Sequence, residues 1–137
     1  MAGETFGGLD ITMPCTDTGV VEGAVVVVTT TGVAALPAAA ASATVIGVSR
    51  ETFQTSTHGI TVRILGVANC ISDGSAAIDE GDIVEVADNT GKIKTVTANF
   101  NGSTNASVVG RAITAAANTS GLRVKVLLAG PATLIRP

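Results

Sequence analysis

One pattern of glycines and β-branched residues occurs twice along the chain, and it constrains the fold more than any other feature. Each copy contains short runs of valine and isoleucine, separated by glycines that occur in the same order. The copies span about residues 21–72 and 79–130, and corresponding glycines lie 58 to 63 residues apart. β-branched side chains favour strands, and short strands separated by glycine turns are typical of barrels and sandwiches. The repeat therefore predicts an all-β domain made of two similar units.

The composition is that of a domain whose core is built from small aliphatic side chains. Hydrophobic residues make up 46% of the 137 residues, yet the chain has no Trp, no Tyr and only three Phe. Val, Ile, Leu and Ala must therefore fill the interior. A chain of this length forms one domain that buries roughly two-thirds of its unfolded surface. Because aromatic volume is scarce, burial of further surface between subunits would add stability.

The apolar runs and the turn residues place the expected strands. We expect an antiparallel β-barrel or sandwich built from two similar meanders, in a single domain over residues 21–137. The continuous run at 21–28 indicates a strand buried on both faces. Residues 38–43, which are almost all alanine, are ambiguous, and we expect a loop with one helical turn there. The other strands are expected at residues 33–36, 44–48, 59–67, 83–86, 92–97, 107–116, 122–128 and 133–135.

The first 20 residues predict an extended N-terminal arm. Several glycines and Pro14 interrupt it, and its apolar residues alternate, so one edge can add as a strand to a partner. Disorder of the isolated chain end is the alternative. Removal of residues 1–13 is expected to leave the domain folded but to abolish binding of the partner. The expected contact residues are Phe6, Leu9, Ile11 and Met13.

Charge and hydropathy argue against two classes of partner. The formal net charge is −3, the basic residues are scattered, and aromatic residues are 2% of the chain. Nucleic-acid binding needs basic patches, and single strands need aromatic stacking platforms, so we expect no nucleic-acid partner. No apolar run reaches the ~18 residues of a membrane span, so no membrane is expected. The N-terminus lacks the basic start and apolar stretch of a signal peptide, which favours synthesis and use in a cytosol-like compartment.

Few residues offer catalytic or metal-binding chemistry. The densest acidic cluster (Asp79, Glu80, Asp82 and Asp88) lacks the ligand spacing of a calcium loop, so it is expected to be a solvated turn. His58 is the single histidine, and a nucleophile pair with Cys15 or Cys70 would need an activated thiol that no neighbouring residue provides. Cys70 is expected to be a buried apolar residue, and Cys15 to be exposed in the arm. We therefore expect no enzyme, no metal, no cofactor and no small-molecule substrate.

Four short motifs of the second copy carry a resemblance to a known family. A Gly-Asp pair begins a strand at Gly81, a Gly-Lys pair occurs at Gly91, a Val-Gly-Arg-Ala-Ile run surrounds Gly110, and Gly121 precedes an alternating valine strand. In this arrangement the chain resembles the capsid cement (head decoration) proteins of tailed phages, over nearly its whole length from about Val20 onward. The first copy is similar to the N-terminal half of that family. The 49–58 connection and the arm have no counterpart in these motifs, so contacts there are not carried over.

The resemblance implies a non-enzymatic protein of the virion. Such a protein is made in the host cytoplasm, binds the outer surface of the head as a homotrimer, and stabilises the shell by clamping neighbouring major capsid subunits. One alternative is another virion β module, a fibre or tail component, that self-assembles without capsid. A further alternative is a small enzyme that uses Cys70 or Cys15 with His58. This alternative would stand only if the substitution His58→Ala abolished a measured activity.

Overall fold

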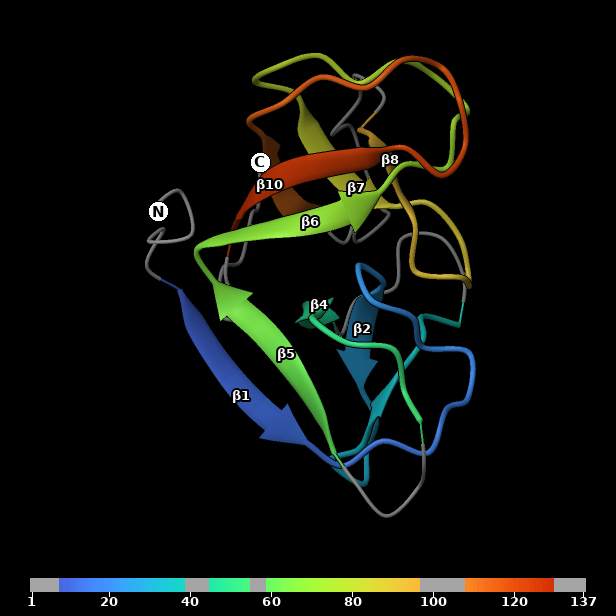
Figure 1. Ribbon diagram of the computed structural model, residues 1–137, viewed down its shortest axis with the longest axis vertical. Helices are drawn as coiled ribbons and strands as arrows, with labels where there is room; N and C mark the ends of the chain where they lie inside the picture. Colours follow the sequence, from blue (N-terminus) through green and yellow to red (C-terminus); the bar gives the residue numbers. More distant parts are fainter. Residues whose placement is uncertain (1–7, 39–44, 55–58, 97–107, 130–137) are drawn as a thin grey trace.

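The computed structural model describes residues 8–38, 45–54, 59–96 and 108–129. Within these ranges the chain contains ten strands and no helix, and the strands form two five-stranded antiparallel sheets. The sheets lie one above the other in Figure 1, with β1 to β5 in the lower part and β6 to β10 in the upper part. The prediction of an all-β fold made of two similar units is therefore confirmed.

The two sheets share one strand order. The first has the order β1-β5-β4-β2-β3, and the second has the order β6-β10-β9-β7-β8, which is the first with every strand number raised by five. The first unit comprises β1 (Leu9–Met13), β2 (Val25–Val28), β3 (Ala34–Ala35), β4 (Val45–Ser49) and β5 (Ile60–Leu65). The second unit comprises β6 (Val67–Ile71), β7 (Ile83–Val86), β8 (Ile93–Thr95), β9 (Val108–Ala112) and β10 (Arg123–Leu128).

Each sheet curls until its two edge strands meet. An isolated parallel bridge joins Cys15, just after β1, to Ala34 in β3, and a second joins Ser72, just after β6, to Ile93 in β8. β1 and β3 are the outer strands of the first sheet, and β6 and β8 those of the second. Closure satisfies edges that would otherwise be exposed, so of the two expected architectures each unit is closer to a small barrel.

The boundary between the units differs from the expected one. The apolar run at 59–67 was expected to be one strand, but β5 ends at Leu65 and β6 begins at Val67 in the other sheet. Between them Gly66 has a φ of 94°, a left-handed conformation that ends the pleated run. Figure 1 shows the chain turning sharply from β5 into β6. β6 is therefore the first strand of the second unit, and β1 is its counterpart in the first.

The expected arm is, in its described part, a strand of the domain. β1 pairs with β5, and Met13 lies opposite Ile60 while Ile11 lies opposite Val62. Met13 is buried, and Ile11 packs against the same core. The alternation correctly indicated a strand, but its partner is β5 of the same chain. Removal of residues 1–13 would take away this strand and the buried Met13 side chain, so the structure gives reason to expect that it destabilises the domain.

Other expected strands are shorter than the patterns indicated. β2 starts at Val25 because residues 21–24 form a turn, in which Gly23 has a φ of 93°. β2 is buried on both faces as expected, since Val26 packs in the first core and Val25 in the second. β9 ends at Ala112 rather than in the following alanine-rich bend. The expectations for 39–44, 97–107 and 130–137, including the strand at 133–135, lie outside the described residues, as does Phe6.

Two glycines at corresponding places allow neighbouring strands to come together. A Cβ on Gly47 in β4 would overlap the carbonyl oxygen of Arg63 in β5, and a Cβ on Gly110 in β9 would overlap that of Leu127 in β10. In each case the obstacle is backbone, which cannot rotate away as a side chain can. The glycine of Ile46-Gly47 and the glycine of Val109-Gly110 are therefore corresponding positions at which each unit needs a residue without a side chain.

We predict that Gly110→Ala destabilises the domain by about 3 kcal/mol, because the added methyl group overpacks a site lined by backbone. Gly32→Ala is the control: Gly32 is another glycine of the repeat, it lies in a turn with a φ of 79°, and no atom lies within 4 Å of the position of an added Cβ. That substitution should cost only about 1 kcal/mol for the left-handed backbone. Urea unfolding of the two variants measures the difference, and equal losses would contradict this account of Gly110.

Candidate functional site

The two cysteines considered for catalysis are buried in different cores. Both cysteines are free and buried, Cys15 in the core of the first unit and Cys70 in that of the second. Burial raises the pKa of Cys70 to about 12, and burial also raises the pKa of Cys15. A nucleophilic thiol needs a lowered pKa and access, and neither thiol has them. Cys70 is the apolar core residue we expected, whereas the expectation of an exposed Cys15 is wrong, because the chain after β1 continues into the core. His58 lies outside the described residues.

The acidic residues stabilise turns. The Asp82 carboxylate accepts a hydrogen bond of 2.9 Å from the backbone N–H of Asp79, and the Asp88 carboxylate accepts one of 2.8 Å from the backbone N–H of Thr90. Hydrogen bonds from Thr90 help hold the pKa of Asp88 below its ordinary value, although burial opposes them. Asp79 and Glu80 are exposed, as expected of a solvated turn. Among the described residues, no group of three His, Cys, Asp or Glu side chains could hold a metal ion.

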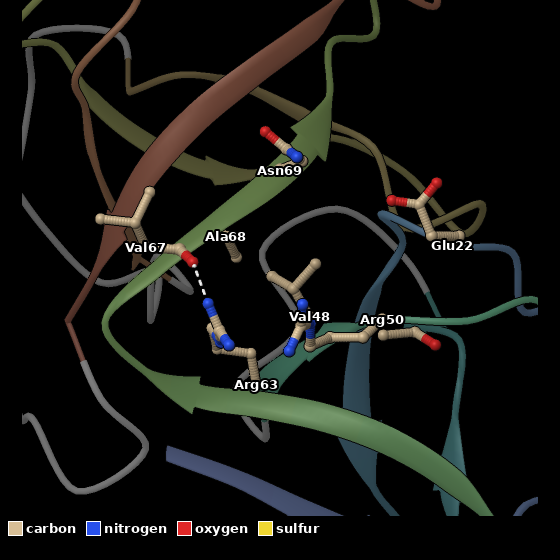
Figure 2. Close-up of a pocket in the computed structure, with 8 residues that line it drawn as sticks. Glu22, Val48, Arg50, Arg63, Val67, Ala68 and Asn69 are labelled. Carbon is tan, nitrogen blue, oxygen red and sulfur yellow. Dashed lines mark hydrogen bonds between the residues drawn. The ribbon is translucent and has the colours of Figure 1, made fainter. Parts of the chain in front are cut away.

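An ionic cluster of Asp10, Arg50 and Arg63 lies where the two units meet. Arg63 Nε is 2.8 Å from Asp10 Oδ1, and Arg50 Nη1 is 2.7 Å from Asp10 Oδ2. Arg63 Nη1 also donates a 2.9 Å hydrogen bond to the carbonyl oxygen of Val67, which Figure 2 shows as the contact between β5 and the start of β6. One guanidinium therefore joins β1, β5 and the first residue of the second unit.

A second arginine joins the units from the other side. Arg123, at the start of β10, donates from Nη1 to the carbonyl oxygen of Glu22 at 2.9 Å, and its Nη2 is 3.2 Å from Glu22 Oε2. The backbone N–H of Val25 adds a 2.8 Å hydrogen bond to the carbonyl oxygen of Gly91. Three separate contacts between the units therefore fix their relative orientation.

A cavity of about 120 Å³ lies between these contacts. Figure 2 shows Arg50 and Arg63 of the first unit facing Val67 and Asn69 of the second across it. Both of its arginines bind the single carboxylate of Asp10. Its full lining is Glu22, Val48, Ser49, Arg50, Arg63, Val67, Ala68 and Asn69. The arrangement positions the units, and it offers no reactive group.

Exposed apolar side chains are the other feature with a possible function. Leu9 is 49% exposed, so of the described arm residues it is the one that presents a large apolar surface, whereas Met13 cannot reach a partner while the domain is folded. In the second unit Leu127 is 50% exposed and Ile113 is 41% exposed. Exposed groups of large apolar side chains often mark surfaces that bind other proteins. The candidate site is therefore an interaction surface.

The ionic cluster could not be found from the sequence. Asp10 and Arg63 are separated by 53 positions and Glu22 and Arg123 by 101. Their proximity depends on β1 pairing with β5 and on the packing of the two units, and no local pattern encodes either. The repeat itself was the available signal, since a strand at 67–71 in one unit implies a strand at 9–13 in the other.

Comparisons with protein-family models and with curated proteins were made for the whole chain. No protein-family model matches the chain, and no curated protein matches it significantly. No helix within the described part of the chain has the length and apolar character that crossing a membrane requires.

We predict that Asp10→Asn removes an acid-sensitive part of the stability. Hydrogen bonds from Arg63, and more weakly from Arg50, lower the pKa of Asp10 against the opposing effect of burial. Because the folded pKa is lowered, this stabilisation is present above the ordinary Asp pKa of about 3.9 and is lost as the pH falls through the folded value. Asp10→Asn should cost about 1 kcal/mol at neutral pH, since both partners keep some solvent contact.

The control for Asp10 is Glu51→Gln, in which an exposed carboxylate of the same unit is neutralised. Thermal unfolding from neutral pH to below pH 4 would show the wild type and the Asp10→Asn variant converging as Asp10 is protonated. A constant difference over that range would contradict the ionic role of Asp10.

We predict the opposite effect for Glu85→Gln. Glu85 is 9% exposed, and the nearest cation, Lys94 Nζ, is 3.9 Å from Oε1. Burial raises the pKa of Glu85, although Lys94 opposes it. Because the folded pKa is raised, the favourable contribution exists below the ordinary Glu pKa of about 4.3 and is lost as the pH rises through the folded value.

At pH 7 the Glu85 carboxylate therefore costs stability, and its neutral analogue should raise the melting temperature by about 3 °C. At pH 4 the gain should disappear. A lower melting temperature for Glu85→Gln at pH 7 would show that the pair with Lys94 outweighs the cost of burying the charge.

Proposed function

We propose that this protein is a capsid cement protein of a tailed phage, which binds the outer surface of the head and stabilises the shell. The proposal rests on the resemblance between the chain and the cement family. The motifs that carry this resemblance lie on the strands and turns of the second unit: residues 78–86 span the turn before β7 and β7 itself, 90–93 the turn into β8, 109–113 most of β9 and the residue after it, and 121–128 the turn before β10 and β10 itself.

The motif glycines have a structural role at their positions. Gly81, Gly91 and Gly121 have φ values of 94°, 78° and 91°, and Gly110 lies against the backbone of β10. The resemblance is therefore a likeness in residues that determine the five-stranded unit.

The physical properties of the domain suit a many-copy clamp. Two units joined by buried side chains and by paired arginines form a rigid body, and such a body loses little conformational entropy on binding. A protein that binds only the assembled shell stabilises it by mass action. In this role the partners are the major capsid protein and, in a homotrimer, other copies of this chain. Leu9 stays a proposed contact, whereas Ile11 and Met13 serve the domain's own core.

The proposed role requires no enzyme activity, cofactor, nucleic acid, membrane or small-molecule substrate. The protein would be made in the host cytoplasm and would end on the outer surface of the virion. The alternative of a fibre or tail component differs from this in the number of copies per particle, because fibres and tails occur at few places on a virion.

The test is the copy number of this chain in purified particles from its source, measured by quantitative mass spectrometry against the major shell protein. We expect a ratio near one to one, as for a protein that covers the whole shell. A handful of copies per particle would favour the fibre or tail alternative, and absence from the particle would reject a role in the virion.

A further inference from the structure

Corresponding rows of residues on the outer faces of the two sheets have different surroundings. In the first sheet Val25 lies opposite Val48, Val48 opposite Arg63, and Arg63 opposite Asp10. In the second sheet the same succession of pairs is found. Ile83 lies opposite Arg111, Arg111 opposite Leu127, and Leu127 opposite Val67. The shared strand order makes these two rows equivalent.

The row of the first sheet is covered by the second unit. Val25 and Val48 are buried, and both belong to the same core cluster as Ala68 and Cys70 of β6. The rest of the row is the Arg63–Asp10 ion pair of the first unit, and Arg63 also donates the hydrogen bond to the carbonyl oxygen of Val67 that joins the units. The outer face of the first sheet is therefore an interface inside the molecule.

Among the described residues, the equivalent row of the second sheet is less covered than the first, since Ile83 and Val67 are only part-buried. Leu127 is 50% exposed, and Arg111, which corresponds to Val48, is exposed. Ile113 is the counterpart of Arg50. The N–H of Ile113 donates to the carbonyl oxygen of Lys125, as the N–H of Arg50 donates to that of Thr61 in the first unit. Where the first unit has the ionic Arg50, Asp10 and Arg63, the second has Ile113, Val67 and Leu127. We call Arg111, Ile113, Lys125 and Leu127 the outer patch.

The charge on the outer patch is also uncompensated. Among the described residues no carboxylate pairs with Arg111 or Lys125, and Arg111 Nη1 donates to the carbonyl oxygen of Gly81 at 2.7 Å. The chain as a whole has the opposite balance, with 11 acidic and 8 basic residues. In the turn before β7, Asp79 and Glu80 are exposed and have no cationic partner in the described part of the chain. Another copy of this chain can therefore supply both the apolar surface and the carboxylates that the patch lacks.

We propose that the outer patch binds a second copy of this chain, so that the outer face of the second sheet is covered between molecules as that of the first sheet is covered within one. This deepens the homotrimer part of the proposed function by naming its contact surface. It is tested without capsid, so its failure can be told apart from failure of the cement role, which the copy number in particles decides.

The experiment measures the association of the purified full chain by sedimentation equilibrium over a wide range of concentrations. We expect an oligomer, and we expect Leu127→Ser to raise its dissociation constant at least about tenfold, because a half-exposed leucine loses its burial at the contact. Leu122→Ser is the matched control, since Leu122 is also exposed but lies just before the start of β10, away from Leu127 near its end. It should leave the dissociation constant unchanged.

A second variant, Lys125→Glu, tests the charge. It should weaken association most at low ionic strength, where screening is least. Circular dichroism and thermal unfolding verify that each variant is folded. A wild-type protein that stays monomeric at every concentration would overturn the proposal, as would an oligomer that Leu127→Ser and Lys125→Glu leave as tight as the wild type.

Discussion

The burial of β2 on both faces holds the two units together, and the arrangement of the molecule depends on it. Val26 packs in the first core, while Val25 packs in the second together with Val48 of the neighbouring strand. A fully buried valine contributes roughly 1.5–3 kcal/mol, whereas an exposed ion pair contributes about 0–1 kcal/mol. The valines therefore supply most of the attraction between the units, and the hydrogen bonds that Arg63 and Arg123 donate across the boundary fix the angle at which the units meet.

The duplication keeps the topology and changes the surfaces. Both units have the same strand order, the same closing bridge and a glycine at the same close approach between strands. At equivalent places the first unit has Val48 and Arg63, which face the second unit, and the second unit has Arg111 and Leu127, which face outward. This face of the first unit thus holds the chain together, whereas Arg111 and Leu127 of the second unit are left exposed.

Sequence reasoning identified the features encoded by local patterns. β-branched runs gave the strand-forming segments, the recurring glycines gave the repeat, and the uninterrupted valines at 25–28 indicated burial on both faces. It failed where the deciding factor is distant in the chain or is a single backbone angle. The φ of 94° at Gly66 divides an apolar run that looks continuous, and β1 looks like a free arm unless β5 is known to lie beside it. The ionic cluster follows from the pairing of β1 with β5, so it could not be predicted from local patterns.

A reconstruction of the source particle by electron cryomicroscopy tests the central claim most directly. The account predicts density for a two-unit β domain on the outer surface of the head, with neighbouring copies touching through β9 and β10. Density in which this face is open to solvent would contradict the account of the outer patch. A head surface that carries no such domain would contradict the proposed function itself.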